Sequence, residues 1–157
     1  MFIRSFVFFV LLGIVGSCAA ELTTPAELRE WDAVTNHEIH LPYSAVVQNL
    51  KRMGDECMNK EFGTDTNLIG GDGSTQYVPT ANIGPTKAEF YTQWYSNTPG
   101  YGEGLQWILY VADVTPKGEK MTKVVLYVSP TSDWAQSIIP AWGRGEDAGC
   151  PILSGFR

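Results

Sequence analysis

The sequence predicts an α+β domain built as a two-layer sandwich, in which an antiparallel sheet carries helices on one face. The first observation behind this prediction is a long amphipathic helix pattern over residues 42–58. The second is a set of three later segments with strict apolar–polar alternation, joined by connections short enough to require antiparallel neighbours. A strand pattern precedes the long helix and a second helix pattern follows the strands, which gives the element order β-α-β-β-β-β-α.

Residues 1–17 are typical of a cleaved signal peptide. Arg4 supplies a positive charge, and the apolar run Phe6–Val15 is too short to span a bilayer, which needs roughly 20 residues. The run ends in Val15-Gly16-Ser17-Cys18, an aliphatic and two small residues before a cysteine, which is the pattern of a bacterial lipobox. This motif predicts that Cys18 begins the mature protein and carries the diacylglycerol and palmitate chains of a lipoprotein. The residues around the cysteine also fit an ordinary signal peptidase, which would release a soluble secreted protein.

Beyond the signal, the chain divides into a short tether over residues 18–24 and a single domain over residues 25–157. Ala19 stands where aspartate would favour the inner membrane, so the predicted location is the outer membrane, with the domain facing the periplasm. The net charge of −6 becomes −7 once Arg4 leaves with the signal. Nucleic acid and anionic lipid surfaces would repel such a chain, so we expect no nucleic-acid partner, and a membrane contact made through the lipid on Cys18.

The three cysteines of the chain divide into one for the lipid and a remaining pair. Assigning Cys18 to the lipobox leaves Cys57 and Cys150 to form a disulfide in an oxidising compartment. Such a bond closes a loop of about 90 residues and stabilises the fold by roughly 4–5 kcal/mol in the chain-entropy model. Two separate buried thiols are the alternative. A metal site is not predicted, because neither cysteine belongs to a CxxC motif or lies near a histidine.

The first half of the domain gives a short helix, a strand and a long helix in turn. Thr24-Pro25-Ala26-Glu27 is a capping box with proline at the first helical position, and it predicts a short helix to about Trp31. Thr35–Leu41 alternates and predicts a strand. Pro42–Met58 predicts the longest helix, whose inward stripe includes a glycine that allows close approach to a sheet; the stripe is Tyr43, Val46, Val47, Leu50, Met53, Gly54 and Cys57.

The segment from Phe62 to Pro85 is rich in turn-forming residues and predicts loops around one short strand near Thr75–Val78. Gly70-Gly71-Asp72-Gly73 at its centre would suit a phosphate only if it followed a strand and opened a helix. No GK[ST] sequence and no helix pattern follows it, so the glycine cluster is interpreted as a hairpin loop and no cofactor is predicted.

Three alternating strands and a second helix complete the domain. The strands are predicted at Lys87–Tyr95, Leu105–Val114 and Met121–Ser129. The first of them has two distinct faces, with Ala88, Phe90, Thr92 and Trp94 on one and Glu89, Tyr91, Gln93 and Tyr95 on the other. Thr131 or Ser132 is predicted to cap the helix, and Pro140 predicts a kink or an early end. A loop then leads to Cys150, and the last residues, from Ile152, are expected to fray.

This order resembles a helix-grip arrangement, and particular segments resemble a group of bacterial proteins. The segments are the lipobox cysteine, the Leu41-Pro42-Tyr43-Ser44 entry to a helix ending in Cys57, and the closing Ala141-Trp142-Gly143 to Cys150-Pro151. Together they resemble uncharacterised lipoproteins of Gram-negative bacteria, over most of the mature chain. The resemblance implies an envelope location and a cysteine pairing. It supplies no catalytic residues, because that family has no assigned activity.

The sequence contains no evident catalytic motif, and we expect that the protein is not an enzyme. His37 and His40 are three residues apart on a predicted strand and would point to opposite faces, whereas the zinc motif HExxH needs a spacing of four on a helix. No GxSxG elbow is present. The alternative is an envelope-directed enzyme that uses clustered carboxylates, since Asp113, Glu89 and Glu103 could converge; solvated surface charges are the default interpretation.

Aromatic residues are the remaining candidates for a binding function. The chain has 5 tryptophans and 7 tyrosines, and several lie on the predicted strands, namely Trp94, Trp107, Tyr91, Tyr95 and Tyr110. They would line a groove for an apolar ligand, peptide or glycan if the helices leave one sheet face uncovered, and would otherwise pack in the core. We therefore expect a binding or assembly module whose partner is an envelope protein or a small apolar ligand. The alternative is a secreted soluble binding protein.

Overall fold

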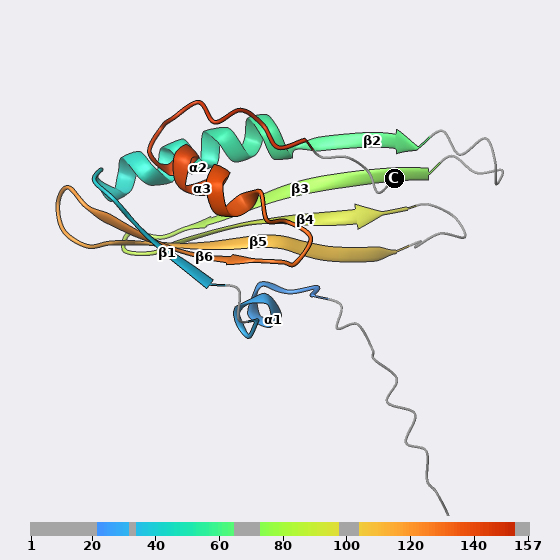
Figure 1. Cartoon of the computed structure of the whole chain (residues 1–157), viewed down its shortest axis with the longest axis horizontal. Helices are drawn as coiled ribbons and strands as arrows, with labels where there is room; N and C mark the ends of the chain where they lie inside the picture. Colours follow the sequence, from blue (N-terminus) through green and yellow to red (C-terminus); the bar gives the residue numbers. More distant parts are fainter. Residues whose placement is uncertain (1–21, 32–33, 65–72, 98–103, 153–157) are drawn as a thin grey trace, which may run out of the picture.

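The computed structural model describes residues 22–31, 34–64, 73–97 and 104–152. They form one open six-stranded antiparallel sheet with three helices, which confirms the predicted α+β class (Figure 1). The strands lie in the order β1-β6-β5-β4-β3-β2, so the first strand, β1, lies beside the last strand, β6. The elements are α1 (Pro25–Arg29), β1 (Val34–Ile39), α2 (Tyr43–Met58), β2 (Lys60–Thr64), β3 (Gly73–Ile83), β4 (Ala88–Ser96), β5 (Leu105–Pro116), β6 (Thr122–Val128) and α3 (Ala135–Gly143).

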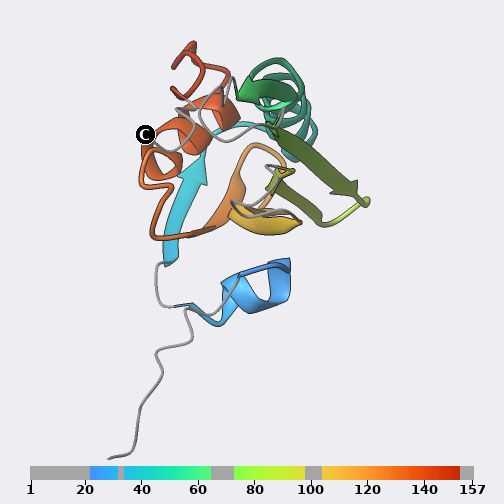
Figure 2. The same cartoon turned by 90° about the vertical axis from the view of Figure 1, so that its right-hand side faces the viewer.

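Helices α2 and α3 cover one face of the sheet, and the main core lies between them and the strands (Figure 2). The predicted stripe of α2 faces inward, with Val46, Leu50 and Cys57 all buried. Trp142 of α3 and Leu126 of β6 are completely buried in the same core. The burial of these large apolar side chains is the main force that holds the helices on the sheet.

The short helix α1 packs against the opposite face of the sheet, below the strands in Figures 1 and 2. The expectation of helices on one face therefore holds for α2 and α3 but not for α1. A helix of five residues has room for one inward apolar side chain, which is Leu28. Leu28 and Leu22 pack against Ile108 and Val111 of β5, and these four buried residues form a second, smaller core. We call this side of the sheet the α1 face.

Strand β3 is longer than predicted, and it pairs with a strand, β2, that the sequence did not predict. Residues 75–83 of β3 pair with residues 96–88 of β4 without interruption. Turn-forming residues such as Pro79 are held extended by this pairing with the neighbouring strand, which overrides their local preference. Of the glycine cluster expected in a hairpin loop, Gly73 begins β3, and residues 70–72 lie outside the described residues.

A β-bulge in β5 decides which side chains share a face. Tyr110 pairs with Thr92 and Ile108 pairs with Gln93, so Leu109 is an extra residue in β5. Leu109 and Tyr110 consequently both face α2 and α3, and the alternation resumes beyond them. Simple alternation along the strand does not predict this change of face.

Helix α3 contains Pro140 and continues to Gly143, so the predicted early end is wrong. A proline inside a helix removes the N–H that would bond to the carbonyl four residues earlier. That carbonyl belongs to Gln136, which is exposed and can bond to water instead. Pro140 itself is buried. Burial against the sheet therefore offsets the missing helical hydrogen bond.

Two buried helical glycines are expected to respond to alanine in opposite directions. At Gly54 a Cβ atom would lie 4.0 Å from Pro79 Cβ, an ordinary contact, so Gly54→Ala should stabilise the fold by up to about 1 kcal/mol through helix propensity. At Gly143 it would lie 2.7 Å from Ile39 Cδ1 in the core, so Gly143→Ala should destabilise by about 1–2 kcal/mol through overpacking. Urea unfolding of both variants measures these changes in the free energy of unfolding. Changes of the same sign in the two variants would contradict the prediction.

Candidate functional site

The five aromatic residues expected to line a groove lie on two different faces of the sheet. Trp94, Trp107 and Tyr110 face α2 and α3, whereas Tyr91 contacts the smaller core on the α1 face. Tyr95 is four residues beyond Tyr91 in β4 and shares its face. The structure therefore does not bring the five rings together into a single groove.

The three rings that face the helices belong to the core packing. Trp94 and Trp107 are directly opposite in β4 and β5 and stack with their centroids 4.8 Å apart. Tyr110 is buried and meets Trp134 edge to face at 6.0 Å. Its hydroxyl accepts a hydrogen bond from the Thr92 hydroxyl at 3.3 Å, and burial raises the pKa of Tyr110 to about 12. These contacts give the rings a clear structural role.

Two of the three carboxylates considered for catalysis do meet on the α1 face. Glu89 of β4 and Asp113 of β5 are direct cross-strand partners, and Arg29 of α1 lies between them. The guanidinium donates to Asp113 from Nε at 3.0 Å and from Nη2 at 2.8 Å, and Nη2 also bonds to Glu89. Lys87 Nζ lies 3.3 Å from Asp113 Oδ1. The third candidate, Glu103, lies outside the described residues.

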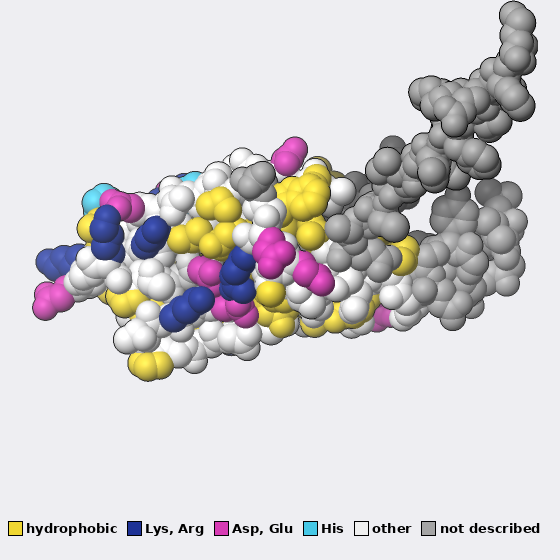
Figure 3. Space-filling view, turned by 90° about the horizontal axis from the view of Figure 1, so that it is seen from below, with side chains coloured by type: hydrophobic (Ala, Val, Ile, Leu, Met, Phe, Trp, Pro, Cys, Tyr) yellow, Lys and Arg dark blue, Asp and Glu magenta, His cyan; other side chains and the backbone are white. Residues whose placement is uncertain are grey.

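The two basic side chains of this cluster offset the charges of its two carboxylates, which suits a structural link better than an acid catalyst. Burial raises the pKa of Glu89, but the hydrogen bonds from Arg29 and Asn82 outweigh it, so the pKa lies below its ordinary value. The Asp113 hydrogen bond is the main cause of the raised pKa of Arg29. Acidic and basic side chains accordingly gather over the middle of the α1 face, as Figure 3 shows. The network fastens α1 to the sheet.

A small groove lies between α2 and the strands β3 and β4, and sequence reasoning missed it. Its volume is about 150 Å³, and its lining includes Leu50, Gly54, Pro79, Phe90 and Tyr110. Gly54 leaves the space open because it has no side chain, and its place on the inward stripe was the one signal in the sequence. The ion pair of Lys51 and Asp55, with 2.6 Å between Nζ and Oδ2, borders the groove.

The edge of β3 beside this groove has backbone groups available for pairing. The Gly84 N–H donates to the Lys87 carbonyl at 2.8 Å, so even-numbered residues of β3 bond to β4 and odd-numbered ones face the other way. Strand β2 pairs only as far as Tyr77. Within the described part of the chain, no strand pairs with the outer edge of β3 from residue 78 to 83. The backbone N–H and C=O of Ala81 point toward this open edge.

The two histidines lie in different surroundings. His37 faces the side of the sheet that carries the helices, and its Nε2 lies 3.0 Å from the Thr35 hydroxyl. His40 follows the end of β1 and is exposed. Burial lowers the pKa of His37, with Arg144 adding to the effect. No group of three or more His, Cys, Asp or Glu side chains suited to a metal ion occurs in the described residues.

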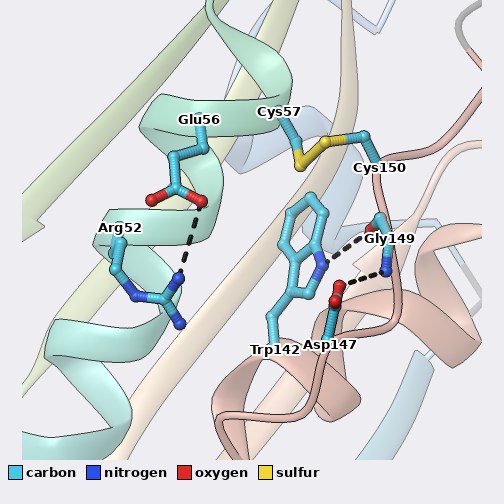
Figure 4. Close-up of a disulfide and its surroundings, with 7 residues drawn as sticks. All are labelled: Arg52, Glu56, Cys57, Trp142, Asp147, Gly149 and Cys150. Atoms are coloured by element: carbon cyan, nitrogen blue, oxygen red, sulfur yellow. Dashed lines mark hydrogen bonds and ion pairs between the residues drawn. A yellow bond between two sulfur atoms is a disulfide. The ribbon is translucent and has the colours of Figure 1, made fainter.

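Cys57 and Cys150 form the predicted disulfide, with their Cα atoms 5.1 Å apart (Figure 4). The bond joins the end of α2 to the segment after α3. Trp142 lies beside it and donates its indole N–H to the Gly149 carbonyl at 3.1 Å. The disulfide and this hydrogen bond together hold the C-terminal segment against the helices. The alternative of two separate buried thiols is therefore wrong.

The first described residues are held on the α1 face rather than extending as a tether. The carbonyl of Leu22 accepts a hydrogen bond from the Ile108 N–H at 2.7 Å, and the Leu22 side chain is buried. The capping box of α1 forms as predicted, because Thr24 Oγ1 accepts from the Glu27 N–H at 3.3 Å and the Glu27 carboxylate accepts from the Thr24 N–H at 2.9 Å. Residues 22–24, which the sequence assigned to the tether, thus lie on the domain.

The helices of the described residues include none with the length and apolar character needed to cross a membrane. No model of a known protein family matches the chain, and no curated protein matches it significantly in sequence.

Proposed function

We propose that the chain is a lipoprotein of the Gram-negative envelope that acts as a binding or assembly module. A lipid on Cys18 anchors it in the outer membrane, and the domain faces the periplasm. The observation that carries this proposal is the Cys57–Cys150 disulfide. Structural disulfides suit an oxidising compartment such as the periplasm, and this one leaves Cys18, at the end of the apolar run, as the remaining cysteine of three.

An extended segment of a partner protein fits the binding role better than a small molecule does. The groove between α2 and β3 has a volume of about 150 Å³, whereas pockets for drug-sized ligands hold about 300–1,000 Å³. It has room for one side chain of a peptide. The neighbouring edge of β3 around Ala81 offers backbone groups that could pair with that peptide as an added strand.

The experiment that tests the anchor compares the wild-type protein with a Cys18→Ser variant in a Gram-negative host. We expect the wild-type protein to sediment with the outer membrane and to have the mass of a chain that begins at Cys18 with added lipid. The variant should lose both the lipid mass and the membrane association, because the thioether cannot form. An unlipidated wild-type chain beginning at Ala20 or Glu21 would instead identify a secreted soluble protein and reject the anchor.

A further inference from the structure

We infer that the anchored domain holds its α1 face against the headgroups of the phospholipid bilayer, and the α2–α3 side away from it. This inference rests on the proposed lipidation of Cys18 and specifies which surface the membrane contacts. Its basis is the place where the ordered chain begins. Leu22 is fixed on the α1 face by its buried side chain and by its hydrogen bond to the Ile108 N–H.

The connection between the lipid and this fixed point is short. Residues 19–21 are the only ones between Cys18 and Leu22. Four steps along a fully extended chain span at most about 14 Å, at 3.3–3.6 Å per residue. The point where the chain joins the α1 face therefore lies within about 14 Å of the residue that carries the lipid.

The opposite side of the domain is too far away for this tether. The solvent face of α2 is separated from Leu22 by the sheet and by a helix about 10–12 Å thick. A chain of about 14 Å would also have to pass around an edge of the sheet to bring that face to the bilayer. The short tether thus favours the orientation with α1 next to the lipid.

The side chains at the end of α1 suit a bilayer interface. Trp31 is 43% exposed and Val34 is 41% exposed, and they flank the connection from α1 to β1. Tryptophan concentrates at the headgroup level of membranes because its ring is apolar and its N–H is polar. The charged groups of the α1 face have both signs, because Arg29 is paired with Glu89 and Asp113. Net charge therefore does not set the contact with the bilayer, and the tether and the Trp31 indole determine it.

The test uses two matched fluorescent probes on the lipidated full-length protein. Asn36→Cys places a probe on exposed β1 of the α1 face, and Gln48→Cys places one on the exposed side of α2. Each protein is reconstituted in vesicles of phosphatidylethanolamine and phosphatidylglycerol that contain a lipid with a nitroxide quencher at its headgroup. We expect quenching at least several-fold stronger at position 36 than at position 48.

The outcomes separate the orientation from the anchor. Equal quenching of the two probes, or stronger quenching at position 48, on protein whose lipid is confirmed by mass would overturn the orientation and leave the anchor in place. A protein without lipid that does not float with the vesicles rejects both proposals.

A variant with a longer tether provides the control for the length argument. About 20 glycine and serine residues inserted after Ala20 would extend the mean reach to roughly 25 Å. This variant should keep its membrane attachment and lose most of the difference between the two probes. If the difference persists unchanged, the tether length does not set the orientation.

Discussion

Removal of the Cys57–Cys150 disulfide is expected to lower the free energy of unfolding by about 4–5 kcal/mol. The two cysteines are 93 residues apart, and the bond restricts the unfolded chain by closing that long loop. For a domain of this size the loss corresponds to a fall in Tm of about 15 °C. The Cys57→Ser, Cys150→Ser double variant and the reduced wild-type protein should unfold at similar temperatures, and calorimetry measures both.

The C-terminal segment is the part of the fold that this change should loosen first. Without the disulfide, the Trp142 hydrogen bond to Gly149 and the burial of Pro151 remain to hold it on the helices. Hydrogen exchange should therefore speed up most between residues 144 and 152. Cys18→Ser serves as the control, because it removes a cysteine without touching the disulfide. A loss of less than about 1 kcal/mol in the double variant would contradict the chain-entropy account.

Arg29→Met is expected to destabilise the domain by about 2 kcal/mol at pH 7. Arg29 is half-buried between the carboxylates of Glu89 and Asp113. Methionine would remove the guanidinium and leave these two negative charges facing each other. Hydrogen bonds between charged groups contribute about 1.5–3 kcal/mol where they are partly shielded from water. Methionine keeps most of the apolar stem, so the loss reports mainly the ionic contacts.

The effect of Arg29 should depend on pH in a defined direction. The pKa of Glu89 is lower in the folded state than its ordinary value of 4.5, so its pairing stabilises the fold above that pH. This contribution disappears as the pH falls through the folded pKa, because the carboxylate takes up a proton. The difference in urea midpoint between the wild-type and Arg29→Met proteins should therefore be largest near pH 7 and shrink as the pH falls below 4.5.

Arg52→Met provides a matched control for this prediction. Arg52 also pairs with a glutamate, Glu56, but both side chains are more than half exposed and the charged atoms are 3.5 Å apart. An exposed pair of this kind contributes about 0.5 kcal/mol or less. Equal losses in the two variants would show that the Arg29 network is an ordinary surface contact rather than the fastening of α1.

The sequence alone determined the elements whose signals are local. The inward stripe of α2 and the alternation of β4 and β6 follow from which side chains avoid water along one segment, and the structure bears them out. The capping box at Thr24 is likewise a contact between neighbours. Counting cysteines was enough to pair Cys57 with Cys150, because one of three had another assignment. The location and the lipid on Cys18 remain predictions of the sequence.

Tertiary structure alone decided the elements that depend on contacts between distant segments. Strand β3 is extended by its pairing with β4, although Pro79 and its neighbours favour turns locally. The extra residue Leu109 in β5 turned Tyr110 to the same face as the helices, away from Tyr91 and Tyr95. Arg29 lies in a helix of five residues, and its carboxylate partners Glu89 and Asp113 are 60 and 84 residues away in the sequence. Periodicity along one segment carries no information about such partners, because they become neighbours only when the sheet assembles.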